Sequence, residues 1–317
     1  MLVRDVERAA IETYDVIIIG GGVYGAMLAL EATARSLRPL LVERGDFGSQ
    51  TSFNSFRLIH GGLRYLQSLD LIRMRESVME RRWFLRNFPD LVAPVPCLMP
   101  LYRRGLRRRD VLRIALLANE LLSYDRNTGL RPDRCLPAGR IVSRAETLRR
   151  YPGIDADKLE GAALWWDASM PDSQRLLMEL FRWSADRGAT VLNYVHAGKL
   201  LVANGKACGI EALDRCSGRM HEFRGQVVIN AAGPWVRQTA AALDSDYPAL
   251  FRPTIAWNIL LDRPPPSDTM LAVQAADPEG QTLFVQPFKG RLLVGTGHAR
   301  WNGGPTAVSP TDGQLAQ

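Results

Sequence analysis

Lysine, histidine and cysteine are scarce in this sequence, with only four of each among 317 residues. The cysteines have neither metal-site nor redox-motif spacing, so we predict four reduced thiols, and the isolated histidines predict no metal site. Arginine supplies most of the 40 basic residues, a bias that is typical of genome composition. The net charge of +7 therefore does not indicate a nucleic-acid partner, although it suits an anionic substrate or lipid.

Long apolar runs are also missing. No stretch approaches the ~18 consecutive apolar residues that a membrane-spanning helix needs. Residues 1–12 carry charges throughout, so we expect no signal peptide and a cytoplasmic protein. An apolar fraction of 46% and a charged fraction of 23% are ordinary for a folded chain, and the length suggests two domains of roughly 150 residues.

The first motif is a glycine-rich turn between a strand and a helix. The β-branched run at 14–19 predicts a buried parallel strand, and the Ala- and Leu-rich stretch at 26–36 predicts a helix. Three glycines with GxGxxG spacing lie between them, namely Gly20, Gly22 and Gly25. This arrangement lets a pyrophosphate approach the helix N-terminus. A second strand at 40–42 ends in Glu43, whose carboxylate can accept hydrogen bonds from both ribose hydroxyls of a dinucleotide.

Three further segments carry a resemblance to a known family. The loop TSFNS occupies residues 51–55, the unusual run LIHGGLRYL residues 58–66, and the turn NAAGPW residues 230–235. With these segments the sequence resembles the FAD-dependent glycerol-3-phosphate dehydrogenase family, within the superfamily of flavoproteins similar to D-amino acid oxidase. The resemblance extends from about residue 14 to residue 304 and implies noncovalently bound FAD.

The resemblance also implies which residues form the site. Arg64 and Tyr65 match positions that face the substrate in the family, and an arginine suits a phosphate or carboxylate. Asn258 stands where the family has a histidine, so His298 is a candidate base in its place, although a lone histidine at a strand end is more often structural. The residues expected to bind FAD are Gly20, Gly22, Gly25, Glu43, Arg44, Thr51, Ser52, Ser55, Arg57, Leu58, His60, Gly61, Gly62 and Gly233. Glycines at 61 and 62 would let the backbone approach the flavin ring without a Cβ clash.

By this resemblance the chain is an FAD-dependent oxidoreductase that oxidises the secondary alcohol of glycerol 3-phosphate, or of a related anionic substrate, by hydride transfer to flavin N5. Two alternatives remain open: a flavin oxidase of an amino or hydroxy acid, and a member that binds FAD weakly and does no chemistry. The expected partners are a small anionic substrate, a quinone or other electron acceptor, a membrane surface and a second copy in a homodimer. Because the family continues beyond the end of this sequence, we expect loosely held flavin and little turnover for this chain alone.

The expected fold class is α/β, with a Rossmann-like FAD-binding domain and an inserted antiparallel β-sheet substrate domain. We assign residues 11–85 and 170–235 to the first domain, 86–169 and 236–300 to the second, and 301–317 to a flexible tail. Four prolines between residues 89 and 100 predict an irregular passage between the domains.

An arginine-rich stretch overlaps a predicted amphipathic helix at 105–123. Six arginines lie between residues 103 and 113, and Val111, Ile114, Ala118 and Leu121 share one face of the helix. This is either a core helix with a charged edge or a helix that lies on a membrane surface. The resemblance favours the second, because the family works at the membrane surface and passes electrons to quinone, so we expect a protein peripheral on the inner face of the cell membrane.

Overall fold

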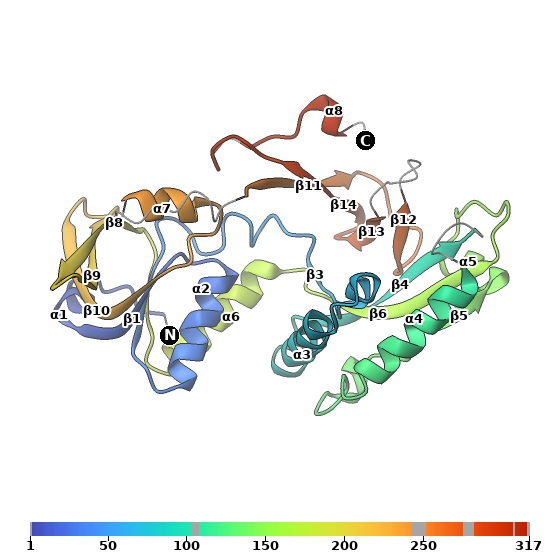
Figure 1. Ribbon diagram of the computed structural model, residues 1–317, viewed down its shortest axis with the longest axis horizontal. Helices are drawn as coiled ribbons and strands as arrows, with labels where there is room; N and C mark the ends of the chain where they lie inside the picture. The colour runs from blue at the N-terminus through green and yellow to red at the C-terminus, as the bar shows by residue number, and fades with distance from the viewer. Residues whose placement is uncertain (1, 103–107, 243–251, 275–281, 307, 316–317) are drawn as a thin grey trace. The chain divides into compact units, whose positions relative to one another are not determined.

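The chain divides into two units in the computed structural model, which describes residues 2–102, 108–242, 252–274, 282–306 and 308–315 (Figure 1). Unit 1 comprises residues 1–55, 173–255 and 300–309, and unit 2 comprises residues 56–172, 256–299 and 310–317. Each unit has its own sheet and its own core. The α/β fold class predicted from the sequence is therefore confirmed.

Unit 1 is built on a sheet in the order β7-β2-β1-β10-β9-β8. Its strands are β1 (Thr13–Ile19), β2 (Pro39–Val42), β7 (Thr190–Leu192), β8 (Val195–Ala203), β9 (Lys206–Asp214) and β10 (Met220–Asn230). Four neighbouring strands, β7, β2, β1 and β10, run parallel to one another. Strands β10, β9 and β8 form an antiparallel meander. The helices are α1 (Val6–Ile11), α2 (Val23–Ala34), α6 (Ser173–Ala185) and α7 (Val236–Ala242), with the short helix η4 (Gly233–Trp235).

The core of unit 1 follows from its β-branched and leucine-rich strands. Ile17 and Leu40 are fully buried on one face of the sheet, in a cluster that the α1 residues Val6 and Ala9 also join. Helices α2 and α6 lie side by side (Figure 1). Strand β1 leads through the glycine turn into α2, and α2 leads into the parallel strand β2. The unit therefore contains the predicted strand–turn–helix–strand motif, and both strands begin and end within two residues of their predicted bounds.

Unit 2 is built on a sheet in the order β11-β14-β13-β12-β4-β6-β3, with β5 paired to β6. Its strands are β3 (Leu58–Ile59), β4 (Ala93–Leu101), β5 (Arg140–Ser143), β6 (Gly161–Ser169), β11 (Thr254–Leu261), β12 (Met270–Gln274), β13 (Thr282–Phe288) and β14 (Arg291–Arg300). Strand β13 pairs antiparallel with β12 and β14, strand β6 pairs antiparallel with β3, β4 and β5, and β12 pairs parallel with β4. Its helices are η1 (Leu63–Ser68), α3 (Leu71–Asn87), α4 (Arg109–Leu122), η3 (Pro132–Arg134), α5 (Arg144–Arg150) and α8 (Asp312–Leu315).

Side chains of β4 and β6 alternate between two apolar clusters, as the two-residue period of a strand requires. Leu98 and Leu164 belong to one cluster, and Cys97 and Trp165 belong to the other, which Leu116 of α4 joins. The second cluster lies between one face of β6 and helices of unit 2. Asp167 lies two residues beyond Trp165, so its buried side chain is on the same face of β6.

The irregular passage predicted between residues 89 and 100 is wrong, because this segment forms strand β4. Its three prolines, at 94, 96 and 100, have the same parity. Successive N–H groups of a strand point to opposite edges, so the missing donors all fall on one edge and the other edge keeps its full set. β4 pairs with β6 over its whole length and with β12 only at residues 97 and 98.

The units divide the chain differently from the predicted domain boundaries at several places, and helix α7, which we assigned to the second domain, belongs to unit 1. Residues 56–85, which we assigned to the first domain, belong to unit 2. Strand β3 pairs with β6 there, and α3 packs on η1 and β6. In the segment predicted as a flexible tail, residues 312–315 form α8.

Candidate functional site

The glycine turn of unit 1 is tied to both neighbouring strands. The Gly20 amide donates to the Val42 carbonyl of β2 at 2.8 Å, and the Ala231 amide beyond β10 donates to the Ile19 carbonyl at 2.8 Å. Gly20 has a φ of +115°, a conformation that favours glycine. A Cβ on Gly20 would lie 2.5 Å from the Ala231 carbonyl oxygen. The turn is therefore fixed against the carboxyl ends of three parallel strands, where open α/β sheets bind ligands.

The other two glycines of the motif have different neighbours. A Cβ on Gly25 would lie 1.9 Å from the carbonyl oxygen of Gly20, so Gly25 allows α2 to pack against the turn. A Cβ on Gly22 would have one neighbour, the Ser52 hydroxyl oxygen at 3.2 Å. Gly22 is thus the N-cap of α2 with open space beside it, which suits a ligand phosphate at the helix N-terminus.

Acidic and hydroxyl groups surround this turn. Glu43 accepts from two backbone amides, with Oε2 2.7 Å from the Gly21 nitrogen and Oε1 2.8 Å from the Gly45 nitrogen. These bonds hold the carboxylate beside the turn. The Ser52 hydroxyl accepts from the Val23 amide at 3.0 Å, in the first turn of α2, and its own proton can point outward to an anion.

The remaining cofactor candidates of unit 1 lie in the loops around this turn. The guanidinium carbon of Arg44 lies 4.3 Å from the ring centroid of Trp235, whose buried indole nitrogen has no hydrogen-bond partner. Gly233 is the first residue of the short helix η4, which ends at Trp235, and it has a φ of +55°. The Ser55 hydroxyl donates to the Ser52 carbonyl at 3.5 Å, and Thr51 is exposed in the same loop.

In unit 2 the run at 60–65 forms a compact group of polar side chains. The His60 and Tyr65 rings meet edge to face with centroids 5.8 Å apart. The Arg64 guanidinium lies 5.0 Å from the Tyr65 ring centroid and donates to its hydroxyl at 3.4 Å. His60 Nδ1 is buried without a hydrogen-bond partner, and burial lowers the pKa of His60, which Asp167 opposes. The imidazole is therefore neutral near pH 7 and presents an unused polar atom.

The two glycines of this run face helix α3. A Cβ on Gly61 would lie 2.2 Å from a guanidinium nitrogen of Arg81, and a Cβ on Gly62 would lie 3.0 Å from the backbone of Met74. Gly62 also has a φ of +79°. We expected these glycines to admit a flavin ring, but packing against α3 accounts for the missing side chains.

Arg57, Leu58 and His298 have different surroundings within unit 2. Arg57 is 8% exposed, and burial lowers its pKa while the nearby Asp172 raises it. Leu58 lies in β3, opposite Ser169 of β6. His298 is exposed near the end of β14. The Asn258 amide oxygen, which stands where the family resemblance expects a histidine, accepts from the Thr296 hydroxyl at 3.0 Å.

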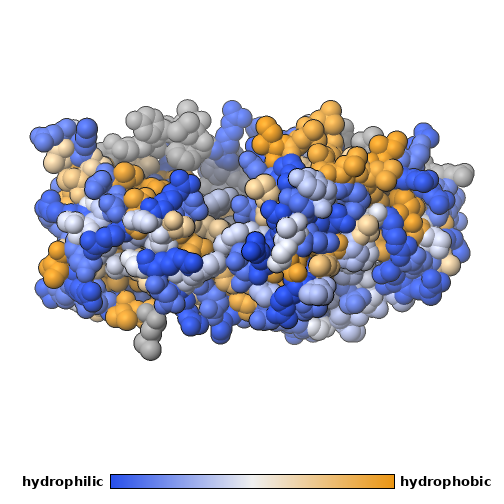
Figure 2. Space-filling view, turned by 90° about the horizontal axis from the view of Figure 1, so that it is seen from below, coloured by the Kyte–Doolittle hydropathy of each residue, from blue (hydrophilic) through white to orange (hydrophobic). Residues whose placement is uncertain are grey.

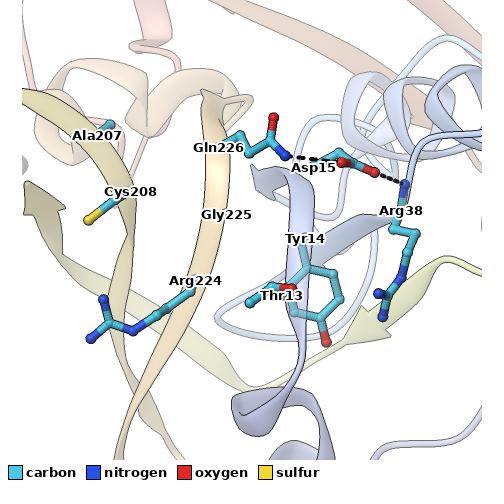
Figure 3. Close-up of a pocket in the computed structure, with 9 residues that line it drawn as sticks. All are labelled: Thr13, Tyr14, Asp15, Arg38, Ala207, Cys208, Arg224, Gly225 and Gln226. Atoms are coloured by element: carbon cyan, nitrogen blue, oxygen red, sulfur yellow. Dashed lines mark hydrogen bonds between the residues drawn. The ribbon is translucent and has the colours of Figure 1, made fainter. Parts of the chain in front are cut away.

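A pocket of about 310 Å³ lies at the opposite end of the unit 1 sheet (Figure 3). Its lining includes Asp15 and Tyr14 near the start of β1, and Asp15 is held by the Arg38 amide at 2.7 Å and by Gln226 at 3.4 Å. Because this pocket lies at the amino end of β1, away from the glycine turn, it is not the predicted dinucleotide site.

Comparison with known proteins decides the family. Residues 15–317 match the family described as FAD dependent oxidoreductase. This chain belongs to the FAD-dependent oxidoreductase family. The class of enzyme and the FAD dependence predicted from the sequence are thereby confirmed.

Individual relatives of this family member are glycerol-3-phosphate dehydrogenases. It is 31% identical over 284 residues to the aerobic glycerol-3-phosphate dehydrogenase of Staphylococcus epidermidis, covering 89% of this chain and 49% of that protein. It is 33% identical over 298 residues to glycerol-3-phosphate dehydrogenase 2 of Mycobacterium tuberculosis, covering 93% of this chain and 49% of that protein. The chain therefore spans about half the length of the curated relatives it matches.

The fold is also shared with a solved member. The X-ray structure of glycerol-3-phosphate dehydrogenase from Bacillus halodurans, complexed with FAD, matches 98% of this chain and 52% of that chain with a TM-score of 0.70 and 22% identity. At this identity the match shows a common fold.

The residues of unit 1 fit a dinucleotide such as FAD. Gly22 leaves open space at a helix N-terminus, Glu43 provides a carboxylate beside the turn, and the buried indole nitrogen of Trp235 lacks a partner. Among the residues that the structure describes, no three His, Cys, Asp or Glu side chains gather as metal ligands. The neutral His60 and the cation Arg64 of unit 2 could serve proton transfer and anion binding.

Proposed function

We propose that this chain is the FAD-binding and substrate-sheet portion of a dehydrogenase that oxidises the secondary alcohol of glycerol 3-phosphate or a related anionic substrate. The observation that carries the proposal is the 31–33% identity, across about nine-tenths of this chain, to proteins named glycerol-3-phosphate dehydrogenase. FAD, when bound, supplies an acceptor for a hydride at N5.

The residues proposed to hold FAD are those around the glycine turn. Gly20 and Gly22 shape the turn, and the N-terminus of α2 carries the partial positive charge that stabilises a pyrophosphate. Glu43 keeps lone pairs beyond its two backbone bonds, so it can accept from ribose hydroxyls and repel a 2′-phosphate. The hydroxyl of Ser52 can donate a further hydrogen bond to a phosphate oxygen. Arg44, stacked on Trp235, presents a flat surface on which an aromatic base can stack.

Arg64 is proposed to bind the anionic group of the substrate. Its guanidinium is exposed and is oriented by the Tyr65 ring and hydroxyl. A planar guanidinium presents paired donors that match the oxygen atoms of a phosphate or carboxylate. Tyr65 limits the rotamers of Arg64, so part of the entropy cost of ordering that long side chain is met before the substrate binds.

Proton removal from the substrate alcohol requires a base that is unprotonated at pH 7, which for a histidine means the neutral imidazole. His60 meets this requirement, because burial lowers its pKa and its Nδ1 has no partner inside the protein. His298, the base expected from the sequence, is exposed near the end of β14. Separate His60→Asn and His298→Asn variants distinguish the two, since loss of the base lowers the rate of flavin reduction about 10²–10⁴-fold.

Anaerobic titration tests the proposed substrate. The purified chain, loaded with FAD, is mixed with glycerol 3-phosphate, with glycerol and with amino acids, and bleaching of the visible flavin absorbance is followed. We expect bleaching by glycerol 3-phosphate and a rise of about tenfold or more in the concentration required by Arg64→Ala. Arg149→Ala, a change at an exposed arginine of α5, is the matched control.

Two results would contradict the proposal. Bleaching by an amino or hydroxy acid but not by glycerol 3-phosphate would support the oxidase alternative, and oxygen uptake would then exceed reduction of a quinone analogue. Failure of the folded chain to bind FAD at all would support the alternative in which the chain does no flavin chemistry.

An exposed apolar face of α4 supports the proposal of a membrane surface as partner. Val111, Ile114, Leu117 and Leu121 are 36–77% exposed, whereas Leu116 on another side of the helix is buried in the core of unit 2. Figure 2 shows hydrophobic residues gathered on the surface in its right-hand half, where α3 and α4 lie. Among the helices the structure describes, none has the length and apolarity to cross a membrane.

The arginines beside this face give the proposal its test. Arg109 and Arg113 are exposed on α4. The arginines at 103, 104 and 107, which belong to the same arginine-rich stretch, lie outside the described residues. We expect co-sedimentation with anionic vesicles that weakens as salt rises, because exposed charges are screened over about 8–10 Å. Binding that is absent at low salt, or equal on neutral vesicles, would contradict this surface.

A further inference from the structure

A buried ion pair in unit 2 contacts Gly61, the residue that follows His60. The Arg81 guanidinium of α3 donates to Asp167 Oδ1 at 2.6 Å, and the two side chains are only 4% and 7% exposed. Neither residue is among the site residues predicted from the sequence, and neither takes part in the function proposed above. Taking two charges out of water is unfavourable unless their geometry and hydrogen bonding compensate, so the partners of this pair are informative.

Every oxygen of the Asp167 carboxylate has partners in unit 2. Oδ1 accepts from the Gly61 amide at 2.7 Å as well as from Arg81, and Oδ2 accepts from the Trp165 indole at 3.0 Å. The Cys97 thiol lies 3.9 Å from Oδ2, and burial raises its pKa, so it stays a protonated donor. A carboxylate held by donors from strands β4 and β6, from helix α3 and from the loop at Gly61 cannot rotate independently of the sheet.

Arg81 also contacts the segment around Gly61 directly, besides its ion pair with Asp167. The space where a Gly61 Cβ would stand is filled by the guanidinium, whose atoms lie 2.2–2.5 Å from that position. Arg81 also donates to the Trp166 carbonyl of β6 at 2.8 Å. The peptide that joins His60 to Gly61 is therefore hydrogen-bonded to Asp167, and the Gly61 Cα lies against the guanidinium of Arg81.

The imidazole of His60 is surrounded by charged groups from each element packed against it. Asp167 of β6 raises its pKa, whereas Arg64 of η1 and Arg81 of α3 lower it, and burial lowers it most of all. The His60 ring also contacts Tyr65 edge to face. A displacement of the Gly61 peptide would therefore move the ring relative to all of these groups.

We infer that Asp167, held by Arg81 and Trp165, is a positioning residue that fixes the peptide between His60 and Gly61 and thereby the imidazole of His60. The role of that imidazole as a base rests on the proposed function, but its coupling to Asp167 belongs to the chain with or without cofactor. Asp167 acts through the Gly61 amide, and it makes the segment rigid at the place where a base has to meet its substrate.

Asp167→Asn is the sharpest test, because the variant keeps the size and one acceptor of the side chain and removes its charge. The readout is the pH titration of the His60 imidazole by NMR in the chain without FAD, assigned by its loss in His60→Asn. We expect the titration midpoint to move down, since Asp167 raises the pKa of His60 and Arg81 lowers it. The matched control is Asp125→Asn, which removes another arginine-paired carboxylate of unit 2 away from residues 60–62.

The FAD-loaded chain gives a second readout. We expect flavin reduction in Asp167→Asn to slow by about 10–100-fold while the control variant reacts as wild type. A folded Asp167→Asn chain whose His60 titration is unchanged overturns the inference. Should that variant fail to fold, the wild-type chain still decides, because the Gly61 amide must then exchange slowly with deuterium, and rapid exchange in the folded chain overturns the inference. Failure of glycerol 3-phosphate to reduce the flavin contradicts the proposed function but leaves the NMR result intact.

Discussion

Two glycines of one motif should respond in opposite ways to the addition of a methyl group. In Gly25→Ala the new Cβ would stand 1.9 Å from the Gly20 carbonyl oxygen, far inside the ~3.5–4.0 Å of a comfortable contact. In Gly22→Ala the Cβ would stand 3.2 Å from the Ser52 hydroxyl oxygen, which can shift by a few tenths of an ångström. The first change strains the backbone packing of α2 on the turn, whereas the second occupies space at the helix N-terminus.

These contacts set the expected magnitudes. Gly25→Ala should lower the free energy of unfolding by about 1–3 kcal/mol, the usual cost of overpacking a rigid site. Gly22→Ala should change it by less than about 1 kcal/mol. It should nevertheless weaken FAD binding about tenfold to a hundredfold, because a phosphate pushed from the helix N-terminus loses one charge-assisted hydrogen bond of about 1.5–3 kcal/mol.

Urea denaturation of the chain without FAD and fluorescence titration with FAD measure the two effects separately. The reasoning requires a crossed result, in which Gly25→Ala is destabilised and Gly22→Ala is stable but binds FAD poorly. A stable Gly22→Ala chain with wild-type FAD affinity would refute the assignment of the turn to the pyrophosphate. A Gly25→Ala chain as stable as wild type would refute the packing argument.

Three further predictions address other parts of the chain. Glu43→Gln should weaken FAD binding about tenfold or more in an equilibrium titration, because a neutral amide is a weaker acceptor for ribose hydroxyls than a carboxylate. The hydrogen bond from Arg75 lowers the pKa of Asp125 from its ordinary 3.8 to about 2, so the stability that this pair contributes is present above pH 3.8 and is lost as the pH falls toward 2. Asp125→Asn should therefore reduce the unfolding free energy by roughly 1–2 kcal/mol at pH 7 and by little at pH 2, as measured by denaturant unfolding at both pH values. Ile114→Ser with Leu121→Ser should reduce vesicle co-sedimentation without lowering the thermal midpoint, since both side chains are mostly exposed, and a large loss of stability would contradict a solvent-facing helix surface.

The part of the fold that the sequence predicts well is the part whose signals are local. Residues 14–43 contain a β-branched strand, a glycine turn, an Ala-rich helix and a second strand ending in an acid, and the structure places each of them where the pattern does. The carboxylate of Glu43 meets the turn because two adjacent parallel strands end at the same edge. Likewise, Asn204 and Gly205, a dipeptide typical of two-residue hairpin turns, form the turn between β8 and β9, both with positive φ.

Strand β4 shows how a local signal can mislead. A proline disrupts a strand only where its missing N–H would have to donate to a neighbouring strand. The sequence shows where the prolines are but not which edge of the strand is paired. In β4 the same-parity prolines leave one complete row of donors, and β6 pairs along nine residues of it. The pairing that decides the matter involves β6, whose residues lie sixty or more positions further along the chain than their partners in β4.

The segment at 60–62 shows the same limit within the candidate site. Its two glycines were attributed to the approach of a flavin ring, but the missing Cβ atoms face Arg81 and the backbone of α3. A glycine in a sequence indicates that a side chain is excluded without indicating which neighbour excludes it. The contact that fixes this segment joins Gly61 to Asp167 across 106 residues, and no periodicity or spacing connects them. Because the Arg81 guanidinium occupies the space of a Gly61 Cβ, any side chain at position 61 would force Arg81 to move away from Asp167, and a sequence pattern gives no sign of that constraint.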